Sequence, residues 1–456
     1  MNYLSIEEIM AACNGKLLCG DKSQYVKGFS RDSREIKQGD IYVGIKGENF
    51  DGNSYYKQAL KNGAIGCIIE EHYEKNIDTA STKNIIIVKD SIKALQDIAT
   101  YRRNQYNIPV VAVTGSVGKT STKDIIANTL AQKYKVLKTE GNKNNHIGLP
   151  LTILELENQE IITVEMGMNH LGEISVLTNI AKPNVCVITN VGTAHIGNLG
   201  SRENILKAKL EILEGMDENG TVVINNDNDL LHKWADENKS NYNIITYGIH
   251  NKSDYMAENI KERETSVEYD IKLNGTNYKI TVPVSGEPFV YNSLCAMAVA
   301  EICNIEIDQA IKGIANFELT KKRMEITKKD GITIINDSYN ASYDSMKAAL
   351  EYLKLTTGNR KIAVLGDMLE LGDFEQELHE KVGEEVAKNN IDILITIGER
   401  AKHIANKAQE MGIKNIYNYT NNEDATKGIK EVLNEGDTVL FKASNSMKLS
   451  EIIVAL

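Results

Sequence analysis

A glycine-bearing segment, TGSVGKTS at residues 114–121, has the residue types of a phosphate-binding loop. It follows the apolar run VVAV at 110–113 and precedes a helical pattern, which predicts a strand, a turn and a helix that begins near Lys119. Glycines let the backbone approach a phosphate, and the amides at a helix start point at its oxygens. Lys119 would neutralise the outer phosphates of a bound nucleotide, and the Thr120 hydroxyl would bind Mg²⁺. The predicted nucleotide-binding residues of this loop are Gly115, Ser116, Val117, Gly118, Lys119, Thr120 and Ser121.

Three side chains further along the chain have the chemistry to complete such a site. Glu165 follows the apolar run IITV, and His195 lies beyond VCVITNVGTA at 185–194. Open α/β sheets place their sites at the carboxyl ends of parallel strands, so both side chains should lie at the same edge as the loop. A carboxylate there can hold Mg²⁺, which prefers oxygen ligands. Lys209 lies in the helical run ENILKAKLEILEG, where the pattern alone favours a solvent-exposed lysine.

The elements that must position these side chains alternate between strands and helices, which predicts an α/β fold of three domains. The expected domains are a small α/β domain at 1–105, a central domain at 106–321 and a C-terminal domain at 322–456. The central domain should hold a mostly parallel sheet behind the phosphate loop, extended by an antiparallel hairpin that turns at Asn274-Gly275. Apolar runs separated by helical stretches predict a Rossmann-like sheet in the third domain.

The composition is that of an acidic globular protein. The 456 residues include 63 acidic and 52 basic side chains, for a net charge of −11, and such a surface repels nucleic acid in general. No run approaches the roughly 18 apolar residues that span a bilayer, and the N-terminus lacks a signal-peptide pattern. Six scattered cysteines are typical of reduced core residues. We therefore expect a cytoplasmic monomer that neither binds nucleic acid nor inserts stably into a membrane.

Together, these residues resemble those of the Mur ligases of peptidoglycan synthesis, which share a short TGSxGKTS loop. A general phosphate-binding loop has its first glycine six residues before the lysine, where this chain has Val113. The likeness covers nearly the whole chain and is strongest to the branch that adds D-alanyl-D-alanine to UDP-N-acetylmuramoyl-tripeptide. The matching stretches are FSRDSREIKQGDIYVGIKGENFDG at 29–52, GNKNNHIGLPLT at 141–152, VEMGMNHLGEIS at 164–175, ITNVGTAHIGNLGSRENILKAKLEI at 188–212, NDSYNASYDSMKAAL at 336–350 and VLGDMLELG at 364–372.

The resemblance implies an ATP-dependent ligase that forms an amide through an acyl phosphate, with Mg²⁺ as a cofactor. Lys209 would carry a carbamate, a CO₂ adduct whose anion serves a second Mg²⁺. The implied catalytic residues are Lys119, Glu165, His195 and Lys209. The implied metal contacts are Thr120, Glu165, His195 and Lys209. The implied nucleotide contacts outside the loop are Asn292, Arg323 and Asp337. The implied substrate contacts are Ser33, Arg34, Asn144, Asn145 and Asn340.

Most departures from the family pattern lie in the third domain. Asn336 stands for the first of two aspartates, Ser342-Tyr343 stands for Asn-Pro, and KASNSMKLS at 442–450 stands for KGSRxMxxE. In the central domain, Pro288 replaces a histidine. Three alternatives stay open: a divergent Mur ligase that adds a different amino acid, dipeptide or depsipeptide, an inactive nucleotide-binding regulatory protein, and a P-loop kinase. A kinase would release a phosphorylated product, and a regulatory protein would show no acceptor-dependent turnover of ATP.

Overall fold

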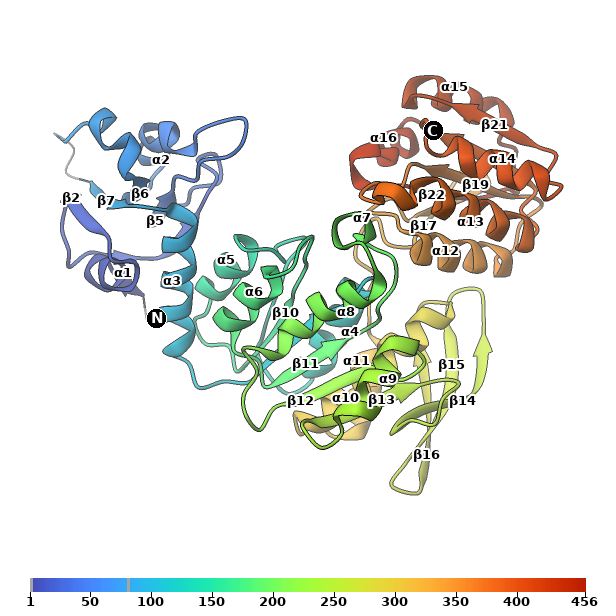
Figure 1. The fold of residues 1–456 in the computed structure, drawn as a ribbon, viewed down its shortest axis with the longest axis horizontal. Coiled ribbons are helices and arrows are strands. Elements are labelled where there is room, and N and C mark those ends of the chain that lie inside the picture. The colour runs from blue at the N-terminus through green and yellow to red at the C-terminus, as the bar shows by residue number, and fades with distance from the viewer. Residues whose placement is uncertain (1–2, 80–82) are drawn as a thin grey trace.

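The structure is a computed structural model that describes residues 3–79 and 83–456, and it holds three larger sheets that follow one another along the chain (Figure 1). The N-terminal and C-terminal sheets lie on either side of the central one in Figure 1. The predicted three-domain α/β fold is confirmed, whereas the exact domain boundaries stay a prediction, and the first includes residues 1–2 and 80–82, outside the described residues. Within the described residues, no helix combines the length and apolar character needed to cross a membrane.

The N-terminal sheet is small and mostly parallel. Only its first strand, β2, runs antiparallel to its neighbour. Helices α1 (Ile6–Cys13) and α3 (Ser91–Asn104) bury their apolar residues against one face of this sheet, and α3 also contacts the central part of the chain. The strands lie in the order β2 (Lys16–Cys19), β7 (Asn84–Val88), β6 (Gly66–Glu70), β5 (Asp40–Val43) and β4 (Gly28–Ser30). The other elements are β1 (Leu4–Ser5), β3 (Tyr25–Val26) and α2 (Tyr56–Lys61).

The central sheet has nine strands and carries the phosphate loop. Its strands from β9 to β14 are parallel, and β14, β15 and β16 are antiparallel, as the alternating pattern predicts. Asn274 and Gly275 both have positive φ, which is the backbone of a tight hairpin turn. The order is β16 (Thr276–Val282), β15 (Val267–Leu273), β14 (Tyr255–Glu262), β13 (Asn243–Gly248), β12 (Thr221–Asn225), β11 (Val185–Ile188), β8 (Val110–Thr114), β10 (Ile161–Glu165) and β9 (Val136–Lys138).

Helices cover both faces of the central sheet and form two separate apolar cores. The helices on one face are α4 (Lys119–Leu130), α10 (Glu287–Ile302) and α11 (Ile307–Ala315). Those on the other face are α5 (Gly148–Leu154), α6 (Glu173–Ala181), α8 (Arg202–Leu210) and α9 (Asp229–Asn238). A sheet covered on both faces explains why its middle strands are nearly continuous apolar runs.

The C-terminal sheet is parallel except for its first edge strand, β17. The edge strand β17 is mostly exposed and β21 is partly exposed, so both lack the apolar runs that predict the inner strands. The order is β17 (Glu325–Lys329), β18 (Ile332–Asn336), β22 (Thr438–Lys442), β19 (Lys361–Gly366), β20 (Ile393–Ile397) and β21 (Ile416–Tyr419). Its helices are α12 (Tyr343–Leu355), α13 (Glu375–Lys388), α14 (Lys402–Glu410), α15 (Asn422–Val432) and α16 (Leu449–Ala455).

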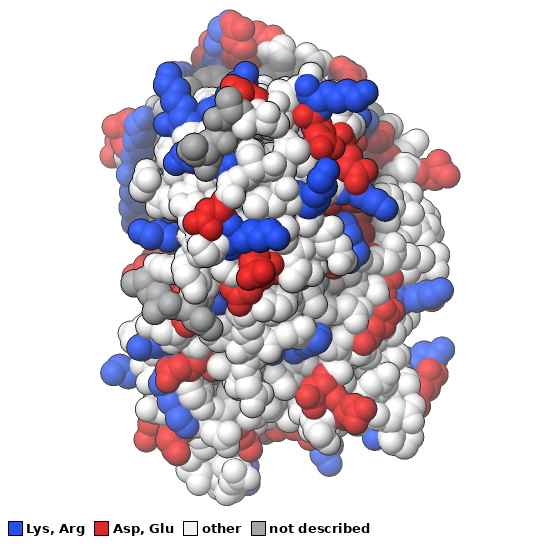
Figure 2. Space-filling view, turned by 90° about the vertical axis from the view of Figure 1, so that its left-hand side faces the viewer, with Lys and Arg blue, Asp and Glu red and all other residues white. Residues whose placement is uncertain are grey.

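The surface charge is mixed on the face at the N-terminal side of the molecule. Lys and Arg side chains alternate there with Asp and Glu over much of the visible surface (Figure 2). Interspersed charges of both signs are typical of an ordinary solvent-facing surface.

Candidate active site

The phosphate loop connects β8 to α4 and has the predicted strand–turn–helix geometry. Gly115 and Gly118 have φ of +153° and +81°, and α4 begins at Lys119. A Cβ atom on Gly115 would lie 1.9 Å from the Thr189 Oγ1 atom, so only glycine fits there. The Ser116 amide donates to the Asn190 carbonyl over 3.0 Å. The loop is thus held against the end of the neighbouring strand β11, with its backbone exposed to the cavity above it.

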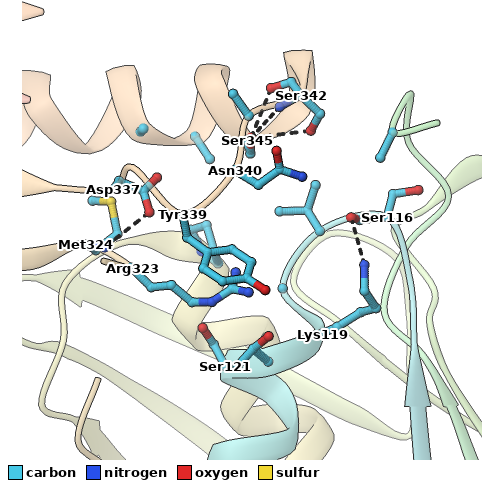
Figure 3. A pocket seen from close by; sticks show the side chains of 18 of the residues that line it. Ser116, Lys119, Ser121, Arg323, Met324, Asp337, Tyr339, Asn340, Ser342 and Ser345 are labelled. Atoms are coloured by element: carbon cyan, nitrogen blue, oxygen red, sulfur yellow. Dashed lines mark hydrogen bonds between the residues drawn. The ribbon is translucent and has the colours of Figure 1, made fainter. Parts of the chain in front are cut away.

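Lys119 folds its ammonium back over this loop (Figure 3). Its Nζ atom donates to the carbonyls of Gly115 over 2.8 Å and Ser116 over 3.3 Å. Burial lowers the pKa of Lys119, the carboxylate of Glu165 opposes this change, and Arg323 adds to it. The ammonium therefore occupies the mouth of the loop, where an outer phosphate would replace the carbonyls as its partner.

Glu165 joins the loop to β10, whose last residue it is. Its Oε2 atom accepts a hydrogen bond from the Thr120 hydroxyl over 2.7 Å, and its Oε1 atom accepts one from Asn144 Nδ2 over 2.7 Å. Glu165 is 1% exposed and pairs with Val113 of β8 in the parallel register, which brings it beside the loop. A buried carboxylate next to a threonine hydroxyl supplies the hard oxygen donors that Mg²⁺ requires, so these residues fit that ion.

Lys209 is buried, so the solvent-exposed position that the helical pattern favours is wrong. The residue is 1% exposed, on the face of α8 that also buries Ile205 and Ala208 against the sheet. Burial lowers the pKa of Lys209 well below its usual value, and the charge of Lys119 lowers it further. No hydrogen bond or ion pair of its amine is found in the described part of the chain. Among those residues, no group of three or more His, Cys, Asp and Glu side chains could hold a metal ion.

The C-terminal sheet supplies the opposite wall of a cavity of about 370 Å³ above the loop. The Arg323 guanidinium lies 4.0 Å from the centre of the Tyr339 ring, and its Nε atom is buried without a partner. Figure 3 shows this pair and Asn340 on the side opposite Ser121. Asp337 accepts a hydrogen bond from Lys442 Nζ over 2.5 Å. The wall thus presents an aromatic ring, a cation and an amide toward the phosphate loop.

Direct contacts hold the two walls together. Asp344, in the first turn of α12, accepts hydrogen bonds from the Thr193 amide over 2.7 Å and from the Thr193 hydroxyl over 2.8 Å. His195 Nδ1 lies 2.6 Å from Glu370 Oε2, and this hydrogen bond lowers the pKa of Glu370. The Gly192 amide donates to the Ser116 hydroxyl, so the segment at 192–195 that contacts the C-terminal sheet also touches the phosphate loop.

The cavity brings together most of the predicted site residues. Those that line it are Ser116, Val117, Gly118, Lys119, Thr120, Ser121, Asn144, Asn145, Glu165, His195, Asn292, Arg323, Asp337 and Asn340. Gly115, Lys209, Ser33 and Arg34 are not among its lining residues. The Ser33 hydroxyl donates to Gln58, and Arg34 is exposed and paired with Asp32.

Several departures from the family pattern have a clear structural place. Pro288 lines the cavity at the start of α10. Ser342 caps α12 in a capping box with Ser345, so the helix still begins correctly without the usual Asn-Pro. Asn445 is exposed at the start of a short 3₁₀ helix and does not line the cavity. Lys448 is likewise outside the lining.

Tyr339, Asp344 and Glu370 are functional residues of this site that no sequence motif singles out. All three lie inside stretches that resemble the family, at 336–350 and 364–372, and this was their only sequence signal. Their partners are far away along the chain, so no local pattern links them.

The fold and the site define a nucleotide-binding α/β protein whose active cavity lies between two sheets. Three family models match the chain: the Mur ligase family catalytic domain at residues 25–111, the Mur ligase middle domain at 113–300 and the Mur ligase glutamate ligase domain at 322–445. The chain belongs to the Mur ligase family, and it is an ATP-dependent ligase that forms carbon–nitrogen bonds.

Known relatives match over nearly the full length. The UDP-N-acetylmuramoyl-tripeptide–D-alanyl-D-alanine ligase of Bacillus subtilis is 38% identical over 94% of this chain and 92% of its own. The crystal structure of MurF from Acinetobacter baumannii superposes with a TM-score of 0.90 at 28% identity, covering 100% of this chain and 98% of that one. MurF from Thermotoga maritima, solved in complex with ADP, has a TM-score of 0.81 at 30% identity, covering 94% and 97%.

Proposed function

We propose that this chain uses ATP to join D-alanyl-D-alanine to the terminal carboxylate of UDP-N-acetylmuramoyl-tripeptide, as a cytoplasmic step of peptidoglycan synthesis. The observation that carries the proposal is the cavity of about 370 Å³. In this cavity, the phosphate loop faces the segment from Asp337 to Ser342. Full-length likeness to ligases named for this reaction supports it.

The reaction brings together two negatively charged groups, the acceptor carboxylate and the ATP phosphates, and the residues around the loop can neutralise this charge. The acceptor carboxylate attacks the γ-phosphorus of ATP, ADP leaves, and an acyl phosphate forms. The dipeptide amine then attacks the acyl carbon, phosphate leaves, and a proton is lost as the amide forms. Lys119 and the loop amides would hold the phosphates during the first step, and water exclusion by the docked walls would protect the acyl phosphate.

The nucleotide would lie between the two walls. Arg323 and Tyr339 would contact its base or ribose from one side, and Asn292 at α10 would contact it from the other. Thr120 and Glu165 would hold Mg²⁺, with His195 close by, and the bound ion would neutralise phosphate charge.

The two substrates would enter from different sides. Ser33 and Arg34 would contact the UDP-sugar on the N-terminal sheet, where the exposed Arg34 guanidinium suits a phosphate. Asn144 and Asn145 would lie along the acceptor, and Asn340 would orient the dipeptide. The Lys442 ammonium is already bound to Asp337 and to the Asn340 carbonyl, so it would position that segment instead of binding substrate.

Lys209 would act as its carbamate. A neutral amine attacks CO₂, forms a nitrogen–carbon bond and releases a proton, which leaves an anionic carbamate. Burial and the nearby Lys119 favour the neutral amine that this step requires. The anion would then serve as an oxygen ligand for a second Mg²⁺.

Product mass spectrometry with a panel of UDP-muramyl peptides and amines tests the proposal. We expect a mass gain equal to D-alanyl-D-alanine minus water, with one ADP and one phosphate released per product. ATP consumption that gives a phosphorylated substrate and no amide would refute it.

A further inference from the structure

The contact between α7 (Ile196–Leu199) and the loop after β19 joins the two walls beside the cavity. His195 directly precedes α7 and meets Glu370 side chain to side chain, with 2.6 Å between Nδ1 and Oε2. The Gly197 amide donates to the Glu370 carbonyl over 3.1 Å. A Cβ atom on Gly197 would lie 2.5 Å from the Gly372 nitrogen, so the two backbones meet with no side chain between them.

The hydrogen bond decides which nitrogen of His195 is free. His195 lines the cavity, and its Nε2 atom has no hydrogen-bond partner in the described part of the chain. A neutral imidazole that donates its Nδ1 proton to a carboxylate keeps a lone pair on Nε2. Glu370 therefore favours the tautomer whose Nε2 atom keeps a free electron pair, as carboxylates do behind metal-binding histidines.

Both His195 and Glu370 have an unusual backbone conformation. His195 and Glu370 each have φ of +64°, a left-handed conformation that residues other than glycine seldom adopt. The loop at 367–372 is held from behind, because the Met368 amide donates over 3.0 Å to Nε2 of the fully buried His379. The carboxylate is thus placed by the C-terminal sheet and is ready when that sheet docks.

We propose that Glu370 is a positioning residue for the ligation reaction. It belongs to the C-terminal domain and orients the His195 imidazole across the interface between the two walls. This rests on the proposed function only in placing His195 at the ATP and Mg²⁺ site. The histidine would be competent only when the two walls are docked, which couples docking to assembly of the site.

The test is a double-mutant cycle of Glu370→Ala and His195→Ala. One measurement is Mg²⁺-dependent binding of a non-hydrolysable ATP analogue by calorimetry, and the other is kcat and KM for ATP. Glu370→Ala should lower kcat about 10- to 100-fold and raise the Mg²⁺ concentration for half-maximal analogue binding by a similar factor. In the His195→Ala background, Glu370→Ala should have no further effect, because it acts through that ring. Glu370→Gln keeps an acceptor oxygen and should recover most of the loss.

Asp373→Ala is the matched control, since this exposed carboxylate lies three residues further on and should leave both measurements unchanged. Gly197→Ala should reproduce Glu370→Ala by blocking the backbone contact. The proposal would be overturned if Glu370→Ala lowered activity as much in the His195→Ala background as in the wild-type protein. It would also be overturned if the Glu370→Ala variant kept the wild-type dependence on Mg²⁺. Analogue binding needs neither acceptor nor dipeptide, so a wrong substrate assignment would leave this coupling intact. Normal ligation without coupling between Glu370 and His195 would refute only the proposed role of Glu370 and would leave the proposed function standing.

Discussion

Replacing Lys209 with methionine should separate a gain in fold stability from a loss of ligation. The Lys209 side chain is 1% exposed and its amine makes no hydrogen bond among the described residues, and methionine fills a similar space without a polar head. Removing an unpaired buried polar group relieves about 1–3 kcal/mol. For a unit the size of the central part, each kcal/mol corresponds to roughly 2–4 °C in Tm. We therefore expect Lys209→Met to unfold about 2–12 °C higher and to lose ligation.

The stability gain should depend on pH. Because the pKa of Lys209 is lowered in the fold, the unfolded chain binds more protons between that lowered pKa and the ordinary lysine value of about 10.4. The stability of the wild-type protein therefore rises with pH across this window. Lys209→Met lacks the titrating group, so its advantage should be largest at the low end of the window and should shrink as the pH rises.

Calorimetric unfolding in CO₂-free buffer with a chelator, repeated across pH, measures this difference. Ligation of the same samples is followed by product mass spectrometry with Mg²⁺ and bicarbonate. Lys207→Met, on the exposed face of the same helix, should change neither quantity. A lower Tm for Lys209→Met would refute the claim that the amine lacks a partner. Full ligation by the same variant would refute the carbamate role of Lys209.

Three further predictions concern the cavity. Lys119→Ala should lower kcat at least about 100-fold with an unchanged circular dichroism spectrum, and full activity would remove this lysine from phosphoryl transfer. Tyr339→Ala removes the ring over Arg323, a contact of about 0.5–2 kcal/mol, so KM for ATP should rise about 2- to 30-fold; Tyr339→Phe is the control, and an unchanged KM would contradict stacking. In competition scored by kcat/KM, D-alanyl-D-alanine should be preferred over single amino acids and depsipeptides, and preference for a single amino acid would refute the dipeptide branch.

Local signals identified the phosphate loop because all of its chemistry lies within a few residues. A strand, two glycines and a lysine at a helix start form one structure wherever they occur together, and the loop folds as predicted. The inner strands were also predictable, since burial on both faces leaves continuous apolar runs. Edge strands such as β17 and β21 were not, because partial exposure removes that pattern.

Lys209 shows where a periodic pattern fails. The helix pattern around it contains several charged residues, and nothing in the run says which face meets the sheet. Only packing decides that Lys209 faces inward while Lys207 faces solvent. Family resemblance pointed to Lys209, but its burial and its lowered pKa come from the tertiary structure.

The α/β class, the phosphate loop and the family can be read from the amino-acid sequence alone, because they depend on short segments and on motifs in a fixed order. How the third sheet completes the site depends on contacts that form only in the folded chain. Asp344 reaches Thr193 and Glu370 reaches His195 across more than 150 positions of the chain. Such pairs form only when separately folded sheets dock, and docking depends on surfaces that no local pattern describes.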